Sequence, residues 1–158
     1  MEKTVCFTGH RTIPESDFEA LNSALREEIQ KQIENGASTF RTGGARGFDT
    51  MAALAVLSFK KANPHIRLSL ILPCPSQTNG WPQNDIEVFE QIRLCADEVH
   101  YQSSFYYNGI LQVRNRSLVH GADVCIAYLR SSEGGGSAYT SALALKEGLE
   151  FVNLQEKI

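Results

Sequence analysis

The chain has 158 residues, enough for one domain with a substantial core, and its hydrophobic fraction of 42% and charged fraction of 21% are ordinary for a globular protein. Its formal net charge of −3 argues against extended binding of nucleic acid, although local arginines and backbone N–H groups can still hold a small anion. No apolar run is long enough for a signal peptide or a membrane span, so we expect a cytoplasmic protein without a membrane partner.

The predicted elements begin with a short apolar strand at residues 5–7, which ends in a turn at Gly9. From 17 to 35, apolar residues recur at spacings of three and four among charged ones, which predicts an amphipathic helix packed on a sheet. A second short strand surrounds Phe40. An alanine-rich helix follows it from about 50 to 62.

A glycine-rich turn joins this second strand to its helix. Gly43, Gly44 and Gly47 let the chain turn sharply and present bare N–H groups at the helix start, an arrangement that can bind an anion. Asp49 could cap N–H groups, favour the positive end of the helix dipole, or bind a sugar hydroxyl. The plain alternative is a tight structural turn. A similar turn at 134–137 follows another strand-like run.

Residues 66–72 form a strongly apolar run, which predicts a central strand ended by Pro73. The loop after Pro73 carries Gln77 and the only tryptophan of the chain, Trp81. Trp81 could stack on a planar ligand while Gln77 binds its polar edge, or Trp81 could simply cover the core.

The rest of the chain continues the alternation, with helices expected at 85–95, 105–120 and 138–148 and strands at 98–101, 123–129 and 151–154. The helix at 105–120 carries Arg114, Asn115 and Arg116. Because residues two apart on a helix point about 200° apart, Arg114 and Arg116 cannot both face one site.

This alternation predicts a single Rossmann-like α/β domain over residues 1–158, with a mainly parallel sheet and helices on both faces. In such sheets, ligands bind at the carboxyl ends of the strands, where the strand order reverses. The predicted elements place His10, Arg11 and Arg116 at that edge. We expect one cleft there, surrounded by Gly9, Gly44, Pro73 and Gly135.

Several kinds of site are disfavoured by the motifs that the sequence lacks. It has no G-x-G-x-x-G after the first strand and no G-x-x-x-x-G-K-[ST], which disfavours hydride transfer and ATP hydrolysis. Its cysteines are scattered without C-x-x-C spacing, so we expect reduced thiols and no metal site. His10 is a candidate proton carrier by residue type, although a polar residue at a strand end is the commoner role.

The ordered set of motifs resembles the YpsA-like branch of the SLOG superfamily. The matching segments are Thr8–Arg11, Thr42–Asp49, Pro73 with Gln77 and Trp81, Arg114–Val119 and Gly134–Thr140. The superfamily includes SMF/DprA proteins, which bind single-stranded DNA, LOG proteins, which are phosphoribohydrolases of cytokinin nucleotides, and proposed sensors of nucleotide-derived ligands. The resemblance implies a Rossmann-like fold with a nucleotide-type ligand over its glycine turns.

The sequence departs from the LOG pattern in the turn at 134–137 and the helix after it. LOG enzymes carry a P-G-G-x-G-T-x-x-E run whose glutamate serves glycosidic cleavage, whereas Leu143 stands three residues after Thr140 here. Without that carboxylate, the site lacks the obvious group for stabilising an oxocarbenium-like centre or activating water. Enzymatic activity is therefore left open, with Asp49 as a carboxylate that could replace the glutamate.

We expect a protein that binds or senses a nucleotide or nucleotide derivative, with no certain cofactor; a homo-oligomer is compatible with the sequence. Arg11, Arg46 and Arg116 are the expected phosphate-binding cations, with the base on Trp81. The rival functions are nucleoside-monophosphate phosphoribohydrolase activity and, disfavoured by net charge, DprA-like DNA binding. The candidate ligand-binding residues are Gly9, His10, Arg11, Gly43, Gly44, Arg46, Gly47, Asp49, Pro73, Gln77, Trp81, Asn115, Arg116, Gly134, Gly135, Gly136, Ser137 and Thr140.

The turn at 134–137 precedes a helix whose first N–H groups lack internal partners, so an anion there would gain several donors and the helix dipole. If this turn is a phosphate site, Gly135→Ala should weaken the binding of a nucleotide far more than that of its nucleoside. The melting temperature should then barely change, whereas a purely structural turn would lose about 1 kcal/mol or more.

Overall fold

Strands and helices alternate through the part of the chain that the computed structural model describes, residues 2–130 and 135–158. The strands are β1 (Lys3–Gly9), β2 (Ala37–Thr42), β3 (Arg67–Leu72), β4 (Glu98–Tyr101), β5 (Val124–Tyr128) and β6 (Glu150–Asn153). The α-helices are α1 (Glu15–Glu34), α2 (Phe48–Lys60), α3 (Gln83–Cys95), α4 (Ile110–Val119) and α5 (Gly136–Lys146). Two 3₁₀ helices are η1 (Pro75–Thr78) and η2 (Leu154–Lys157).

All neighbouring strands of the sheet run parallel, in the order β4-β3-β2-β1-β5-β6. The chain builds the sheet outward from β1 to β4 and then returns to add β5 and β6 on the other side of β1. The strand order therefore reverses between β1 and β5, which makes this pair the topological switch point. The predicted Rossmann-like α/β fold is confirmed.

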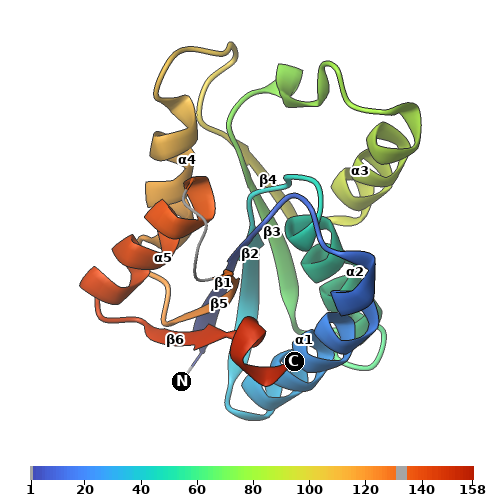
Figure 1. The fold of residues 1–158 in the computed structure, drawn as a ribbon, viewed down its shortest axis with the longest axis vertical. Helices are drawn as coiled ribbons and strands as arrows, with labels where there is room; N and C mark the ends of the chain where they lie inside the picture. Colours follow the sequence, from blue (N-terminus) through green and yellow to red (C-terminus); the bar gives the residue numbers. More distant parts are fainter. Residues whose placement is uncertain (1, 131–134) are drawn as a thin grey trace.

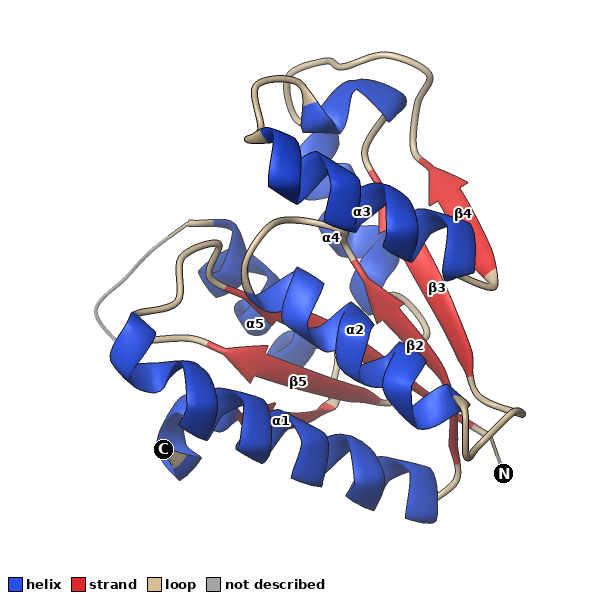
Figure 2. Ribbon diagram, turned by 90° about the vertical axis from the view of Figure 1, so that its right-hand side faces the viewer, coloured by secondary structure: helices blue, strands red, loops and turns tan. Residues whose placement is uncertain are grey.

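Helices cover both faces of the sheet (Figures 1 and 2). On one face, α1, α2 and α3 enclose the larger core, to which β1 and β2 contribute Val5, Phe7 and Phe40. On the other face, α4 and α5 pack together over a smaller cluster that includes Cys6 and Cys125. Successive side chains of β1 thus enter opposite layers, as expected for a parallel strand that is buried on both faces.

The predicted strands and helices are all present, with one substantial change of boundary. The helix expected from residue 105 begins at Ile110, because Gly109 adopts a left-handed backbone with φ of +95° just before it. The three aromatic residues at 105–107 therefore lie in an exposed loop. None of the helices in the described ranges is both long and apolar enough to cross a bilayer.

Candidate functional site

The turns that follow four of the strands lie at one edge of the sheet, because all strands point the same way. Gly9 ends β1, Gly44 follows β2, Pro73 follows β3 and Gly135 precedes α5 after β5. The expectation that these positions share an edge is confirmed. In place of a single cleft, two adjoining cavities open there, and both are lined by Arg11, Ala45 and Arg114.

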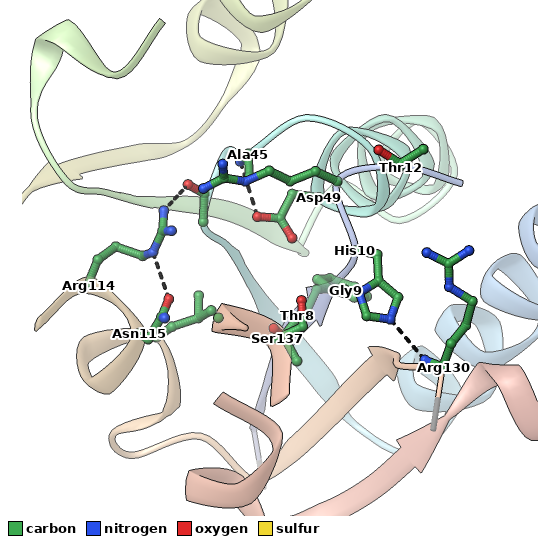
Figure 3. A pocket seen from close by; sticks show the side chains of 15 residues that line it. Thr8, Gly9, His10, Thr12, Ala45, Asp49, Arg114, Asn115, Arg130 and Ser137 are labelled. Atoms are coloured by element: carbon green, nitrogen blue, oxygen red, sulfur yellow. Dashed lines mark hydrogen bonds between the residues drawn. The ribbon is translucent and has the colours of Figure 1, made fainter. Parts of the chain in front are cut away.

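The first cavity, of about 410 Å³, lies over the carboxyl ends of β1 and β5, at the topological switch point (Figure 3). Its lining comes from separate parts of the chain: residues 7–12, then Gly43, Ala45 and Asp49, then Arg114, Asn115 and Leu118 of α4, then Arg130, and finally Gly136 and Ser137 of α5. Residues distant in sequence thus meet where open α/β sheets bind their ligands.

Positive charge dominates the described lining of this first cavity. Arg11, Arg114 and Arg130 border it, and Asp49 is the one carboxylate among the described residues that do so. The first N–H groups and the dipole of α5 add positive partial charge at Gly136. The cavity therefore favours an anionic group, although the whole chain carries a formal net charge of −3.

Arg114 is fixed in position, and only 7% of its surface is exposed. Its Nη1 donates to the carbonyl oxygen of Gly43 at 2.5 Å, and its Nε donates to Oδ1 of Asn115 at 2.9 Å. Burial lowers the pKa of Arg114, while the nearby carboxyl of Asp49 raises it. A guanidinium has five N–H donors, so Arg114 retains others for an anion in the cavity.

Asp49 binds the glycine turn from the first turn of α2, where its Oδ2 accepts the N–H of Ala45 at 3.1 Å. Burial raises the pKa of Asp49 from 3.8 to about 6, an effect that Arg114, the backbone N–H groups of the turn and Arg11 only partly oppose. A Cβ atom at position 43 would lie 2.9 Å from Nη1 of Arg114, so a side chain there would displace that guanidinium. The carboxyl of Asp49 therefore stabilises the turn and titrates close to neutral pH.

His10 is buried at the carboxyl end of β1 and borders the first cavity (Figure 3). Its Nε2 accepts the N–H of Arg130 at 2.9 Å, and its ring packs edge-on against Tyr128. This hydrogen bond requires an unprotonated Nε2. His10 thus links the ends of β1 and β5, and a proton-carrying role for it stays a prediction.

The second cavity, of about 350 Å³, lies beside the first one, between the loop around η1 and the loop that precedes α4. The η1 side includes Pro73, Gln77 and Trp81, and the other side includes Tyr106. Its lining is more apolar than that of the first cavity. Aromatic rings on two walls suit a planar group.

Trp81 combines the two roles that the sequence left open. Its ring packs edge-on against Phe89 of the core, with 5.7 Å between centroids, and it also borders the second cavity. The guanidinium of Arg46 lies 5.6 Å from the centre of the Trp81 ring and 3.6 Å from the carboxylate of Asp85. Gln77 fastens the same loop to the glycine turn, because its Nε2 donates to the carbonyl oxygen of Gly44 at 3.0 Å.

Most of the predicted site residues border one of these cavities. The first is lined by the predicted residues Gly9, His10, Arg11, Gly43, Asp49, Asn115, Gly136 and Ser137. The second is lined by the predicted residues Arg11, Arg46, Pro73, Gln77 and Trp81. Gly134 lies outside the described residues.

The other predicted residues border neither cavity: Gly44, Gly47, Arg116, Gly135 and Thr140. Gly47 serves close packing, because a Cβ there would lie 2.2 Å from the carbonyl oxygen of Arg11. The hydroxyl of Thr140 donates to the carbonyl oxygen of Gly136 within α5. Gly44, Gly47 and Gly135 shape the turns around the site through their positive φ angles.

Arg116 requires a correction, because it projects from the opposite side of α4. It is exposed, its Nη1 lies 3.5 Å from the hydroxyl of Tyr139, and it borders a separate hollow over the sheet. Arg114 faces the first cavity instead, so the inference that the two arginines cannot share a site is confirmed. Leu143 borders the same hollow as Arg116. Leu143 therefore does not border the first cavity.

The sequence reasoning missed Arg114, Arg130 and Tyr106 as site residues. Arg130 had a usable signal, since it follows the apolar strand β5 just as Arg11 follows β1. Arg114 had none beyond its spacing from Arg116, because helix periodicity does not say which face points inward. Tyr106 was assigned to a helix and in fact lies in the loop that borders the second cavity.

Fold and site together define a class: a Rossmann-like α/β domain with an arginine-lined cavity at its topological switch point. Residues 7–151 match the model of the YspA SLOG family, and the chain belongs to this family.

Curated bacterial relatives resemble the chain over most of its length. It is 24% identical over 155 residues to a UPF0398 protein of Bacillus thuringiensis (strain Al Hakam), a match that covers 92% of this chain and 84% of the relative. It is 25% identical over 129 residues to a UPF0398 protein of Brevibacillus brevis, which covers 80% of this chain and 69% of the relative.

Two solved structures share the fold. DNA processing protein A from Helicobacter pylori, whose structure was described for its single-stranded DNA binding mode, is 25% identical with a TM-score of 0.60; the match covers 94% of this chain and 63% of that one. The structural genomics target TM1055 is 18% identical with a TM-score of 0.61, covering 97% of this chain and 74% of that one. The second match bears on the fold alone.

Proposed function

We propose that this protein binds a nucleotide or nucleotide derivative, with the phosphate in the first cavity and the base in the second. The observation that carries this proposal is the convergence of Arg11, Arg114, Arg130 and the start of α5 on one cavity, against the single described carboxylate of Asp49. Guanidinium groups and helix N-termini are the groups that proteins use to bind phosphate.

The two cavities are joined in a way that suits a ligand with an anionic and a planar part. Arg11 and Arg114 border both, so a phosphate beside them can carry a substituent into the second cavity. There Trp81 and Tyr106 offer aromatic surface for a base. Volumes of about 410 and 350 Å³ are within the range of small-molecule sites.

Substitution of single arginines tests the proposal. Arg11→Gln removes an exposed cation that borders both cavities, and Arg116→Gln removes an exposed cation from the far side of α4 as a matched control. We expect Arg11→Gln to weaken the binding of a nucleoside monophosphate about tenfold or more, and to change that of the nucleoside far less. Arg116→Gln should bind like the unmodified protein.

Calorimetric titration with a panel of nucleoside monophosphates and their nucleosides provides the measurement. Thermal melts of each variant show that it is folded. Equal affinities of Arg11→Gln and Arg116→Gln would refute phosphate binding at this edge.

A second candidate is cleavage of a nucleotide N-glycosidic bond, and the position of Asp49 favours it. Its carboxyl borders the first cavity with a pKa of about 6, which suits proton transfer near neutral pH. Release of free base from a nucleoside monophosphate, abolished in Asp49→Asn, would identify the enzyme. Binding without base release would leave nucleotide binding as the function.

A further inference from the structure

The backbone just after β5 carries Arg130 to the first cavity beyond the end of the strand ladder. The last paired residues of β5 and β6 are Ala127 and Asn153, and β5 itself ends at Tyr128. Leu129 and Arg130 therefore lie outside the ladder. The contacts that fix the backbone of these two residues therefore determine where the Arg130 side chain can point.

The side chain of Asn153 hydrogen-bonds the backbone of Leu129, as a neighbouring strand would. Its Oδ1 accepts the N–H of Leu129 at 3.1 Å, and its Nδ2 donates to the carbonyl oxygen of Leu129 at 2.9 Å. An asparagine amide can replace a peptide group in this way because it has both an acceptor and a donor. Oδ1 also accepts the N–H of Gln155 at the start of η2, where the chain turns out of the sheet.

His10 holds the next residue from the opposite side. Its Nε2 accepts the N–H of Arg130 at 2.9 Å, as Figure 3 shows. His10 is itself anchored, since its carbonyl oxygen accepts the N–H of Phe48 at 3.1 Å and its ring packs on Tyr128. Leu129 and Arg130 are thus bound to side chains from β6 and from the residue that follows β1.

We propose that Asn153 and His10 form a clamp that aims Arg130 into the first cavity, so that Asn153 is a positioning residue for anion binding although it does not border the cavity. The proposal rests on the proposed function of that cavity. An arginine whose backbone is already fixed loses less conformational entropy when its guanidinium binds an anion, which raises the affinity for the anion.

Two pairs of variants separate positioning from folding. Asn153→Leu removes both hydrogen bonds to Leu129 and the one from Gln155, whereas Asn153→Asp keeps the acceptor and replaces the donor by a charged carboxylate oxygen. His10→Leu removes the acceptor for Arg130, whereas His10→Gln places an amide oxygen where Nε2 lies. Asn63→Leu is the matched control, because it removes a hydrogen bond from the side-chain amide to the carbonyl oxygen of Phe59 at the far end of α2.

Two measurements on the full chain test the clamp and its effect on anion binding. Hydrogen exchange of the Leu129 and Arg130 amides, followed by NMR without ligand, reports the clamp itself. Titration with inorganic phosphate, followed by NMR, reports anion binding. We expect Asn153→Leu and His10→Leu to accelerate exchange of the clamped amides and to weaken phosphate binding about tenfold. His10→Gln should largely restore both, Asn153→Asp should be intermediate, and Asn63→Leu should change neither.

Unchanged phosphate affinity in Asn153→Leu and His10→Leu, or unchanged exchange of the clamped amides, would overturn the proposal. Failure of the proposed function would look different. The unmodified protein would then bind no phosphate, while the two leucine variants would still accelerate exchange at Leu129 and Arg130. That result would remove the anion site and leave the clamp as a purely structural device.

Discussion

At the scale of single residues, Asp49 has a charge that depends strongly on its surroundings. Only 7% of its surface is exposed, and burial outweighs the opposing effects of two arginines and of backbone N–H groups on its pKa. The carboxylate both stabilises the glycine turn and reduces the positive charge of the first cavity. Its protonation should therefore change both stability and anion binding.

The free energy of unfolding should depend on pH through the titration of Asp49. Between pH 3.8 and about 6, the folded protein holds a proton that the unfolded chain releases, so the free energy of unfolding falls as the pH rises through this window. The interval corresponds to at most about 3 kcal/mol. Asp49→Asn should remove this dependence and be more stable than the unmodified protein above pH 6.

Urea unfolding of both proteins at pH 4.5 and 7.5 checks this prediction. Other groups titrate equally in the two proteins, so the difference between them isolates Asp49. A difference that does not change between the two pH values would show that the carboxyl keeps an ordinary pKa.

At the level of secondary-structure elements, the turn into α5 shows why adjacent glycines differ. Gly135 has a φ of +105° and a ψ of −163°, a conformation that residues with a side chain rarely adopt. Gly136 belongs to the helix, and the nearest atom to a Cβ there would be Nδ2 of Asn115 at 3.8 Å. The backbone conformation of Gly135 therefore favours the alternative, in which Gly135→Ala costs stability.

Gly136→Ala is the better probe of this element. Alanine suits a helix better than glycine, so the melting temperature should stay the same or rise slightly. The added methyl group enters the lining of the first cavity beside Asn115 and should weaken the binding of a nucleotide more than that of its nucleoside. Gly135→Ala should instead destabilise the fold by about 1–3 kcal/mol, which lowers the melting temperature by several degrees.

Calorimetry with both ligands and a thermal melt of both variants measure these effects. Equal losses for nucleotide and nucleoside in Gly136→Ala would remove phosphate from the start of α5. A stable Gly135→Ala would contradict the assigned backbone conformation.

For the whole molecule, the distribution of charge matters more than its total. Arginines gather at one edge of the sheet, while the chain as a whole is slightly acidic. A single phosphate needs only the local group of cations, whereas an extended strand of DNA needs a basic surface along its backbone. The similarity to the DNA processing protein of Helicobacter pylori makes this distinction testable.

We predict that single-stranded oligonucleotides are not retained at about 0.15 M salt, because few arginines could neutralise phosphates along the strand. Fluorescence anisotropy of a labelled oligonucleotide across a salt series measures this directly. Tight binding with a steep salt dependence would instead favour a DNA-binding function, and the loss of that binding in Arg11→Gln would locate it at the same edge.

Local patterns in the amino-acid sequence predict the class of fold and the edge of the sheet that carries the site. Alternating apolar runs and amphipathic segments specify strands and helices through local periodicity, and parallel strands bring every turn after a strand to one edge. The positions of Gly9, Arg11 and Gly43 at that edge therefore follow from local patterns alone.

Which side chains face inward depends on how the elements pack together. Helix periodicity separates Arg114 from Arg116 but cannot say which one packs against Gly43, because that depends on how α4 lies on the sheet. The raised pKa of Asp49 and the hydrogen bond between Asn153 and Leu129 likewise arise from groups that are distant in sequence. Burial and long-range hydrogen bonds exist only once the sheet order brings those groups together.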